Sequence, residues 1–372
     1  MTGGGTGGHI YPGLAIAEAL AADAACAPLD VLFVGTRDRL EAQIVPKAGV
    51  PIAYVHAAPL VRRFSARDPF ALARTVVANA AGFVESLAIL HRARPDVLIA
   101  TGGYVALPVV AALRFVRLLR RTRAKTALLE PNAVAGVTNR LLAPLVDEVW
   151  YAIAPRRALR PRERVPGTPV RASLRRALEP AAARRELGID PAKTTIVVMG
   201  GSQGASSLNA AAAELVERGL PPGRQIVVIA GARDAAALAE RLAGRPGALV
   251  VPYLDDPRAA FAAADVVVAR AGASTLAELA ATATPALLVP YPHATADHQR
   301  HNAEAYAASG AARVLADSDL HAARLAAELD AMLDERALAA LRDAARTLAA
   351  ADPQAAIVAR VKALCASNET LP

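Results

Sequence analysis

The sequence of 372 residues contains few cysteines and few aromatic side chains. Its two cysteines, Cys26 and Cys365, have no second cysteine or histidine nearby at a metal-binding spacing. A disulfide framework is therefore excluded, and we expect two buried structural thiols. Aromatic residues make up 4% of the chain, so its cores must be built from Ala, Val and Leu. The 54% hydrophobic content excludes a disordered, collagen-like or coiled-coil protein.

Long uninterrupted hydrophobic runs are also missing. The longest uncharged segments cover residues 97–113, 194–213 and 279–296, and each contains a glycine pair or several prolines. They are typical of strand–loop–helix units, and we predict no transmembrane span. The chain opens directly into a glycine-rich loop, so we expect no signal peptide.

Negative charge is scarce in the first half of the chain. Residues 1–165 contain 21 Lys and Arg against 12 Asp and Glu, which favours a phosphate-bearing partner, either nucleic acid or an anionic membrane. Apolar residues alternate with arginine at helical spacing from Leu113 to Lys125, as in a helix on a membrane surface. The segment 61–64 is a weaker candidate. The alternative is a solvated arginine-rich helix, because the chain has 38 Arg and only 4 Lys.

Short apolar runs alternate with Ala-rich helical stretches along the whole chain. Such runs predict buried parallel strands in two sets, and hence two doubly wound domains; they are residues 31–35, 97–100, 126–129, 195–199, 225–229, 265–268 and 286–289. The segment 154–169, with four prolines, is the predicted linker. Because the first glycine loop begins at Gly3, we expect the strand before it to be missing and its neighbours to be unpaired.

Two glycine-rich loops are each followed by a predicted helix. Residues 3–9 fit a GxGxxG pattern, and residues 199–205 form a second loop of this type. Glycines let the backbone approach a ligand, and a helix N-terminus attracts phosphate. Two such loops on separate domains indicate a ligand held between the domains. His9 lies in the first loop, where it either caps the loop or takes part in chemistry.

A third strand–loop–helix segment runs from Arg270 to Glu278. Glu278 could favour the helix dipole, or it could accept both hydroxyls of a ribose. His293, Asp297 and His298 follow, but their spacing matches no standard metal site. We therefore interpret this region as a polar loop against a nucleotide and expect no metal.

These motifs, in this order and at this spacing, resemble the MurG family of peptidoglycan glycosyltransferases over nearly the whole chain. The resemblance is carried by residues 4–9, 31–38, 102–105, 132–134, 200–204 and 270–302. It implies an α/β protein of the GT-B type, with two Rossmann-like doubly wound parallel-sheet domains and an interdomain cleft. Residues 1–160 would form the acceptor- and membrane-facing domain, joined by a C-terminal helix at about 351–368. Residues 170–350 would bind the UDP-sugar.

The resemblance also implies the site residues. Contacts to UDP-N-acetylglucosamine would fall on Thr6, Gly7, Gly8, Asn132, Arg171, Ser202, Leu254, Ala273, Ser274, Thr275, Leu276, Ala277, Glu278 and Gln299. Tyr104 and His9 would face the acceptor. Two departures from the family pattern, Pro131 before Asn132 and Thr168 before Pro169, put the position of their loops in doubt.

The implied reaction is an inverting transfer of N-acetylglucosamine to the C4 hydroxyl of muramyl-pentapeptide pyrophosphoryl-undecaprenol in peptidoglycan synthesis. His9 is the candidate base, because an ordinary imidazole titrates near neutral pH. Glu278 would bind ribose, and Arg171 a phosphate. We expect no cofactor, no metal and no nucleic acid, and a peripheral location on the cytoplasmic face of the membrane.

Two other functions are compatible with parts of the pattern. An NAD(P)-dependent Rossmann oxidoreductase explains GxGxxG, but it predicts an acidic residue at the end of the second strand, where residues 35–38 read Gly-Thr-Arg-Asp. A non-catalytic nucleotide-sugar-binding protein explains the loops but gives His9 no role.

Overall fold

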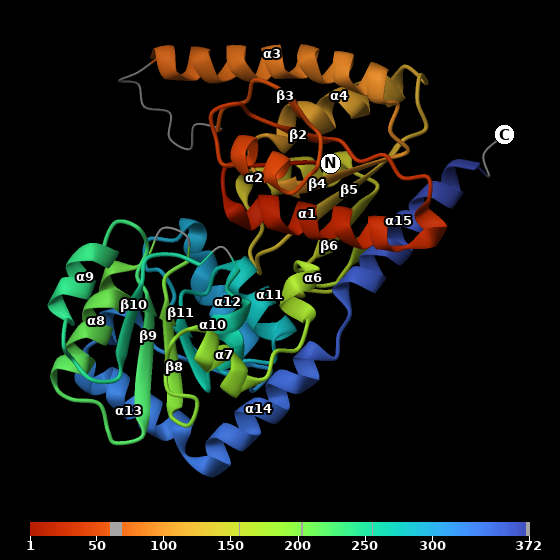
Figure 1. The fold of residues 1–372 in the computed structure, drawn as a ribbon. Coiled ribbons are helices and arrows are strands. Elements are labelled where there is room, and N and C mark those ends of the chain that lie inside the picture. Colours follow the sequence, from red (N-terminus) through yellow and green to blue (C-terminus); the bar gives the residue numbers. More distant parts are fainter. Residues whose placement is uncertain (60–68, 156, 202–203, 255, 370–372) are drawn as a thin grey trace. The chain divides into compact units, whose positions relative to one another are not determined.

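The structure, a computed structural model, describes residues 1–59, 69–155, 157–201, 204–254 and 256–369. The chain forms two compact units (Figure 1), one made of Met1–Arg171 with Asp352–Pro372 and the other of Ala172–Ala351. We call them unit 1 and unit 2. Each is built on its own parallel β-sheet.

Unit 1 contains a parallel sheet of seven described strands in the order β3-β2-β1-β4-β5-β6-β7. The strands are β1 (Thr2–Gly3), β2 (Phe33–Gly35), β3 (Ile52–Tyr54), β4 (Val97–Gly102), β5 (Lys125–Glu130), β6 (Glu148–Tyr151) and β7 (Glu163–Arg164). The helices are α1 (Gly7–Ala22), α2 (Glu41–Lys47), α3 (Pro69–Ala93), α4 (Ala106–Leu118), α5 (Val137–Leu142) and α15 (Pro353–Glu369). Chain order reverses between β1 and β4, and in such sheets ligands bind beyond the carboxyl ends of the strands at this point.

Both faces of this sheet are covered, because alternate side chains of a strand point in opposite directions. Leu98 and Ala100 of β4 join a core with α4, whereas Ile99 joins a core with α1 and α15. Trp150 is the largest fully buried side chain, and most other core residues are Ala, Val, Leu and Ile. Cys26 and Cys365 lie at the margin of the core formed with α1 and α15. Both are half-buried rather than fully buried as predicted.

Two expectations about unit 1 are wrong. The first strand is not missing: Thr2 and Gly3 form β1, which pairs with both β2 and β4. Two residues suffice because Thr2 is completely buried and its backbone joins both neighbours. The predicted linker 154–169 contains β7, which pairs with β6 at the edge of the sheet. Its prolines are compatible with this position because an edge strand has one unpaired side.

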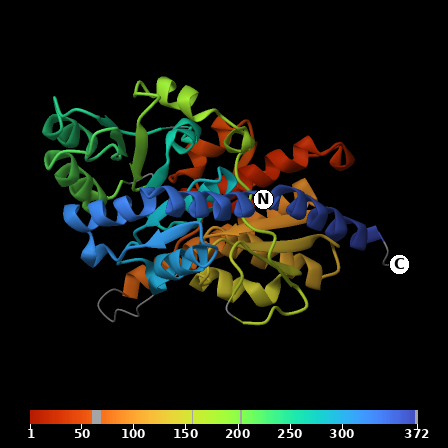
Figure 2. The same cartoon turned by 90° about the horizontal axis from the view of Figure 1, so that it is seen from below.

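The last helix, α15, belongs to unit 1 although about 180 residues separate it from the rest of that unit. It packs beside α1, as Figures 1 and 2 show, and inserts Ile357, Val358, Val361 and Leu364 into the core. Lys362 Nζ lies 2.6 Å from Asp23 of unit 1. Arg360 also forms an ion pair with Glu148 of β6.

Unit 2 contains a parallel sheet of six described strands in the order β10-β9-β8-β11-β12-β13. The strands are β8 (Thr194–Met199), β9 (Arg224–Ile229), β10 (Ala248–Val251), β11 (Val266–Ala269), β12 (Ala286–Leu288) and β13 (Ala312–Val314). The helices are α6 (Ala172–Arg175), α7 (Pro180–Glu186), α8 (Ser206–Glu217), α9 (Ala235–Arg241), α10 (Arg258–Ala263), α11 (Ala273–Ala281), α12 (His298–Ala307), α13 (Ala322–Leu333) and α14 (Glu335–Ala349). Chain order reverses between β8 and β11.

Two of the three uncharged runs fold as expected into a strand followed by a helix, β4 with α4 and β8 with α8. The third, 279–296, instead holds the end of α11 followed by β12. Among the described residues, one helix, which lies outside these three runs, is long and apolar enough to cross a membrane by length and composition alone. It covers Leu72–Ala93 within α3, and only 11% of its most apolar window is buried. Core helices of soluble proteins meet the same criterion, so this finding is weak evidence for a span. This segment was not among the membrane-contacting segments predicted from the sequence.

Candidate functional site

The first glycine loop lies against the ends of β4 and α2. A Cβ atom on Gly3 would come within 2.0 Å of Thr101 Oγ1, and one on Gly4 within 2.5 Å of Glu41 Oε1. Only glycine fits in these two positions. The loop leads into α1, where Thr6 is the N-cap residue in an extended conformation and makes no side-chain capping bond. Because the first turn has no acidic residue, the positive end of the helix dipole is available to an anion.

Glu41 holds this loop in place through hydrogen bonds, a role that was not predicted from the sequence. Its side chain is completely buried at the start of α2. Its carboxylate accepts hydrogen bonds from the backbone N–H of Gly5 (3.1 Å) and Thr36 (3.2 Å), and from the Thr36 hydroxyl (2.6 Å). A buried carboxylate bonded to three donors holds a loop that has no side chains of its own to pack. The 36-residue separation from Gly5 hides this role in the sequence.

His9 lies in the first turn of α1, next to the end of β4. Its Nδ1 is 2.8 Å from the Thr101 carbonyl oxygen, and the Thr101 hydroxyl donates to the His9 carbonyl at 2.6 Å. Because a carbonyl can only accept, the hydrogen bond assigns the proton of a neutral imidazole to Nδ1. Nε2 is then the basic nitrogen. Gly102 permits this contact: its φ is +100°, and a Cβ there would lie 2.9 Å from the imidazole.

Tyr104 and Arg171 lie around the same loop. A Cβ on Gly5 would be 2.9 Å from the Tyr104 ring, so this ring covers the loop. The Arg171 guanidinium lies 5.1 Å from the centre of the Tyr11 ring in α1, which is cation–π geometry. Unit 1 therefore brings Thr6, Gly7, Gly8, His9, Tyr104 and Arg171 to one edge of its sheet.

Asn132 is held by Glu130 at the end of β5. One oxygen of Glu130 accepts from the backbone N–H (2.9 Å) and the side-chain amide (3.2 Å) of Asn132. The other accepts from Gly136 N (3.2 Å) and Asn139 Nδ2 (2.8 Å). Burial raises the pKa of the Glu130 carboxyl, although these hydrogen bonds oppose the rise. Pro131 therefore does not prevent an ordered loop.

Thr168 occupies the second position at which the chain departs from the family pattern. Its hydroxyl is buried and has no hydrogen-bond partner among the described residues. The hydroxyl therefore makes no visible contribution to the fold.

The second glycine loop follows β8 in unit 2. A Cβ on Gly200 would lie 2.2 Å from Ala205 N, and one on Gly204 would lie 2.4 Å from the Ala230 carbonyl oxygen. Both positions therefore require glycine. The loop opens α8, whose N-cap residue Ala205 has no side-chain capping bond. Ser202, a predicted donor contact, lies outside the described residues.

The predicted run Ala273–Glu278 forms the first two turns of α11. Six consecutive helical residues point in all directions, so they cannot all face one ligand. Leu276 is 3% exposed in the core, which leaves only its backbone for a ligand. The Ser274 hydroxyl is buried with no hydrogen-bond partner in the described structure. Glu278 is half-buried in the second turn of the helix. Ala273, Thr275 and Ala277 are also half-buried.

Gln299 and Leu254 complete the predicted set in unit 2. Gln299 lies in α12, and its side-chain oxygen accepts from Tyr291 N at 3.0 Å. Leu254 is half-buried in the loop after β10.

Arg270 had no predicted role, although it begins the motif that contains the donor residues. It is buried and donates to Asp317 (2.6 Å), Ser207 (2.7 Å) and the carbonyl oxygens of Val289 and Pro290. These contacts tie the ends of β11 and β12 to α8. Arg270 is therefore an organiser of this edge of the sheet.

The side chains once considered for a metal site, in residues 293–298, contact other protein groups. His298 Nδ1 lies 2.8 Å from the Thr295 carbonyl oxygen, and Asp297 forms an ion pair with Arg300. Within the described ranges, no group of three or more His, Cys, Asp or Glu side chains is placed to hold a metal ion.

Family models and known relatives show which family the chain belongs to. Residues 1–151 match the glycosyltransferase family 28 N-terminal domain, and residues 195–357 match its C-terminal domain. A Salinibacter ruber protein is 40% identical over 371 residues, which cover 98% of this chain and 96% of the relative. It is named UDP-N-acetylglucosamine–N-acetylmuramyl-(pentapeptide) pyrophosphoryl-undecaprenol N-acetylglucosamine transferase. The chain belongs to the MurG family.

Two further relatives agree with the MurG assignment. A Desulforudis audaxviator protein of the same name is 39% identical, covering 94% of this chain and 93% of the relative. The crystal structure of Acinetobacter baumannii MurG aligns with a TM-score of 0.73 and 25% identity, covering 97% of this chain and 98% of that one. The GT-B fold and the glycosyltransferase class are thus confirmed, and nothing supports the oxidoreductase alternative.

Proposed function

We propose that this MurG-family chain transfers N-acetylglucosamine from UDP-N-acetylglucosamine to the C4 hydroxyl of muramyl-pentapeptide pyrophosphoryl-undecaprenol, with inversion at the anomeric carbon. Relatives at 40% and 39% identity over nearly the full chain carry the name of this reaction. The main support for the mechanism is the contact of 2.8 Å between His9 Nδ1 and the Thr101 carbonyl oxygen. It orients the imidazole beside the first glycine loop.

His9 acts as the general base. The acceptor C4 oxygen attacks the anomeric carbon, its proton passes to His9 Nε2, and the bond between the anomeric carbon and the diphosphate oxygen breaks. Thr101 keeps the ring in the tautomer that can accept this proton, and it stabilises the imidazolium that results. Tyr104, beside the loop, is placed to contact the acceptor.

The departing UDP gains negative charge on its diphosphate. The N-terminus of α11, after Gly272, has no acidic residue in its first turn and no side-chain cap. Its N–H groups and dipole stabilise that charge without moving during the reaction. Ser274 supplies a hydroxyl, and Glu278 binds the ribose hydroxyls. The roles of Arg171 and Asn132 as donor contacts stay predictions from the resemblance.

The test of this proposal is UDP release with and without the lipid-linked acceptor. The wild type should release UDP at a high rate only when the acceptor is present. His9→Ala should lower the turnover rate by about 10²–10⁴-fold, the usual contribution of a general base, without changing donor affinity. His91→Ala, which removes an exposed histidine at the end of α3, is the matched control. A His9→Ala enzyme with wild-type turnover would assign the base elsewhere.

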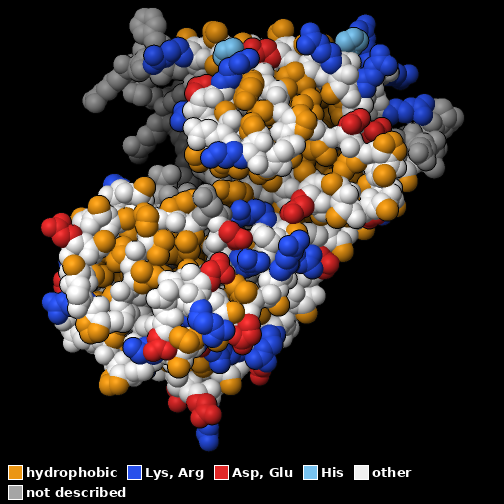
Figure 3. Space-filling view, in the orientation of Figure 1, with side chains coloured by type: hydrophobic (Ala, Val, Ile, Leu, Met, Phe, Trp, Pro, Cys, Tyr) orange, Lys and Arg blue, Asp and Glu red, His pale blue; other side chains and the backbone are white. Residues whose placement is uncertain are grey.

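We also propose that unit 1 docks on an anionic membrane, where such an acceptor resides. The surface of α3 and the end of α4 exposes seven large apolar side chains, which we call the α3–α4 face: Leu72, Val76, Val77, Val84, Phe115, Leu118 and Leu119. Phe83 of α3 packs against Phe115 of α4 with ring centres 5.8 Å apart, so the two helices form one surface. In Figure 3, apolar side chains with Lys, Arg and His among them lie along the edge that α3 forms.

The structure changes which residues of the predicted basic helix serve this face. Leu113 is 1% exposed in the core, and Arg117 makes a bidentate pair with Asp147 at 2.6 and 3.0 Å. Neither is available to lipid. Four arginines near the end of α4 remain exposed, namely Arg114, Arg120, Arg121 and Arg123. The weaker candidate, residues 61–64, lies outside the described residues. Docking of this face would make the protein a peripheral membrane protein, and its location on the cytoplasmic side stays a prediction from the resemblance.

A further inference from the structure

Unit 2 contains a cavity of about 600 Å³ that has no role in the proposed transfer reaction. It is bounded by the α6–α7 segment, α10, the turn between α11 and β12, and α14. Asp265 and Pro285, which line it, immediately precede β11 and β12. The cavity therefore lies at the amino ends of these strands, whereas the donor loops follow the carboxyl ends of β8 and β11. Its volume is typical of a small-molecule site.

The lining is rich in arginine well beyond the composition of the chain. Six of its nineteen residues are arginine, compared with 38 of 372 in the whole sequence. They are Arg175, Arg176, Arg184, Arg258, Arg342 and Arg346. The only carboxylate among these lining residues is Asp265. We call this cavity the arginine pocket.

Asp265 does not neutralise the pocket, because both of its oxygens are already engaged. Arg184 donates to it at 2.9 Å, the backbone N–H of Thr195 donates at 2.8 Å, and Arg342 binds its other oxygen. Arg184 also donates to the carbonyl oxygens of Ala263 and Pro191, so it serves the fold. For Arg176, Arg258 and Arg346, the residues that line the pocket offer no further carboxylate.

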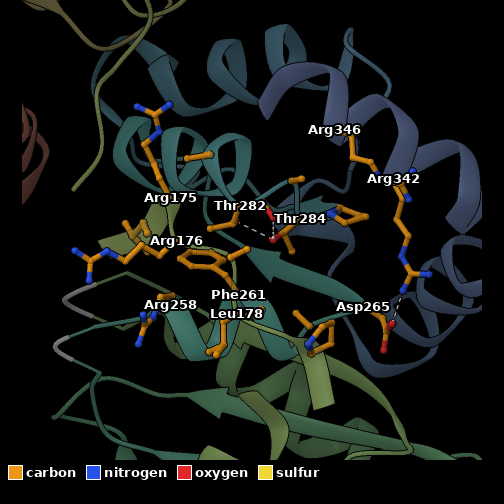
Figure 4. Close-up of a pocket in the computed structure, with 18 of the residues that line it drawn as sticks. Arg175, Arg176, Leu178, Arg258, Phe261, Asp265, Thr282, Thr284, Arg342 and Arg346 are labelled. Atoms are coloured by element: carbon orange, nitrogen blue, oxygen red, sulfur yellow. Dashed lines mark hydrogen bonds and ion pairs between the residues drawn. The ribbon is translucent and has the colours of Figure 1, made fainter. Parts of the chain in front are cut away.

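Several of those arginines are available to a ligand. Arg176 is exposed and has no ion-pair partner within the described structure. The Nε of Arg258 is buried without a hydrogen-bond partner among the described residues, and its ion pair with Asp256 is long, at 4.0 Å. Among the described residues Arg346 pairs only with Asp343 on its own helix, and both side chains are largely exposed (66% and 72%), so this pair is weak. Figure 4 shows Arg176 and Arg258 on one side of Phe261, with Arg342 and Arg346 on the other.

The floor of the pocket is apolar. Phe261 is 2% exposed, and Leu174 and Leu178 lie beside it. The hydroxyls of Thr282 and Thr284 are 2.8 Å apart and hydrogen-bonded to each other, so they present little unsatisfied polarity. An apolar floor with guanidinium groups at its rim fits a ligand that has an apolar body and an anionic group.

We propose that the arginine pocket binds a small soluble organic phosphate. The planar guanidinium of arginine matches phosphate oxygens in both geometry and charge, which favours phosphate over a carboxylate of lower charge. The phosphate lies against Arg176 and Arg258, and the apolar body lies over Phe261 and Leu178. This site is independent of the donor site, and the proposal does not depend on the transfer reaction.

The experiment measures the binding of phenyl phosphate and of inorganic phosphate to the full chain by calorimetry, with and without saturating UDP. Phenyl phosphate should bind at one site that UDP does not block, at least about fivefold more tightly than inorganic phosphate, because the ring gains apolar burial. The double variant Arg176→Glu/Arg258→Glu should weaken this binding by about tenfold or more.

Arg185→Glu/Arg336→Glu is the matched control. It makes the same charge change at two exposed arginines of α7 and α14 that lie outside the pocket lining, and it should leave binding unchanged. An equal loss in both double variants would overturn the proposal in favour of a general charge effect. It would also be overturned if phenyl phosphate bound only in competition with UDP, or did not bind.

A phospholipid headgroup offers the same chemistry as a soluble phosphate. Vesicles containing phosphatidylglycerol distinguish the two sources, because both double variants should sediment with them equally. Loss of vesicle binding by Arg176→Glu/Arg258→Glu alone, without phenyl phosphate binding by the wild type, would overturn the assignment to a soluble ligand.

Discussion

Single side chains at the candidate site owe their positions to partners far away in the sequence. His9 is oriented by Thr101, 92 residues later, and the loop before it is held by Glu41. The sequence identified His9 and both glycine loops because their local pattern is unusual. It could not identify Glu41, since nothing near this residue marks it as a partner of Gly5. Its buried carboxylate became recognisable only when β1, β2 and α2 were assembled.

Glu278 tests the donor site at the scale of one residue. Glu278→Ala should weaken UDP-N-acetylglucosamine binding by about 1–3 kcal/mol, the range for losing a hydrogen bond to a charged group. Calorimetric titration with the donor measures the effect. Glu214→Ala, at an exposed position on α8, should bind the donor as the wild type does. If both variants bind the donor as tightly as the wild type does, Glu278 acts only through its favourable interaction with the dipole of α11.

At the scale of elements, side-chain contacts decided the role of two segments. The segment around β7 was predicted as a linker from its prolines, but β7 pairs with β6, and the Tyr151 hydroxyl of β6 donates to Glu163 at 3.3 Å. Its carboxylate accepts from Arg157 at 2.6 and 2.7 Å and from Arg160 N at 2.8 Å. The predicted basic helix from Leu113 to Lys125 is helical only as far as Leu118, where α4 ends, and packing turns Leu113 and Arg117 inward. Periodicity identified the helix, whereas the neighbouring elements determined its exposed face.

The Glu163 contacts predict a pH dependence of stability. Hydrogen bonds from Arg157, with Arg160 N, lower the pKa of Glu163 from 4.5 to about 2, although burial opposes the change. Because the folded-state pKa is depressed, this carboxylate stabilises unit 1 above pH 4.5, and the contribution is lost as pH falls toward 2. Glu163→Gln should therefore reduce stability at pH 7 by about 1–3 kcal/mol.

Urea unfolding between pH 7 and pH 3 checks this prediction. The difference between the wild type and Glu163→Gln should shrink as the pH falls below 4.5, because the unfolded chain then takes up a proton that the folded carboxylate, with its pKa of about 2, does not. Asp343→Asn, at an exposed site on α14, is the control and should change stability little at any pH. A constant difference across the range would contradict the assigned pKa.

The α3–α4 face is tested at the scale of two helices. Each basic residue near an anionic surface contributes about 1 kcal/mol, so Arg114→Glu/Arg120→Glu/Arg121→Glu should largely abolish sedimentation with phosphatidylglycerol vesicles at low salt. Wild-type binding should also fall steeply as salt rises, since exposed charges are screened. Val76→Ser/Val77→Ser, at 60% and 67% exposed sites, should weaken binding by removing apolar contact.

The control for this face is a triple reversal of exposed arginines in unit 2, namely Arg185→Glu/Arg218→Glu/Arg336→Glu. It changes the net charge equally but should leave vesicle binding in place. Equal binding by the wild type and the α4 triple variant would remove this face from the membrane interface while leaving the glycosyltransferase assignment intact.

At the scale of the whole molecule, α15 is the element that joins the end of the chain to its beginning. Ile357 is completely buried between α1 and the sheet of unit 1. Ile357→Ala should reduce the stability of unit 1 by about 2–5 kcal/mol, the usual cost of truncating a large aliphatic side chain in a core. Thermal unfolding followed by circular dichroism measures the change.

Ala363→Ser, on the exposed side of α15, should change the midpoint by little. A wild-type melting profile for Ile357→Ala would mean that α15 contributes little to the cooperative core of unit 1.

The sequence by itself determined the local structure of this protein and its family. Continuous apolar runs specify buried parallel strands, and glycine loops that open helices specify phosphate sites, because both signals depend on neighbouring residues. The tertiary structure alone decided which distant residues meet. Thr2 and Gly3 complete a sheet, Glu41 holds a loop, and six arginines from four segments line one pocket. Such contacts depend on how strands are ordered and helices packed, and no local pattern records that order.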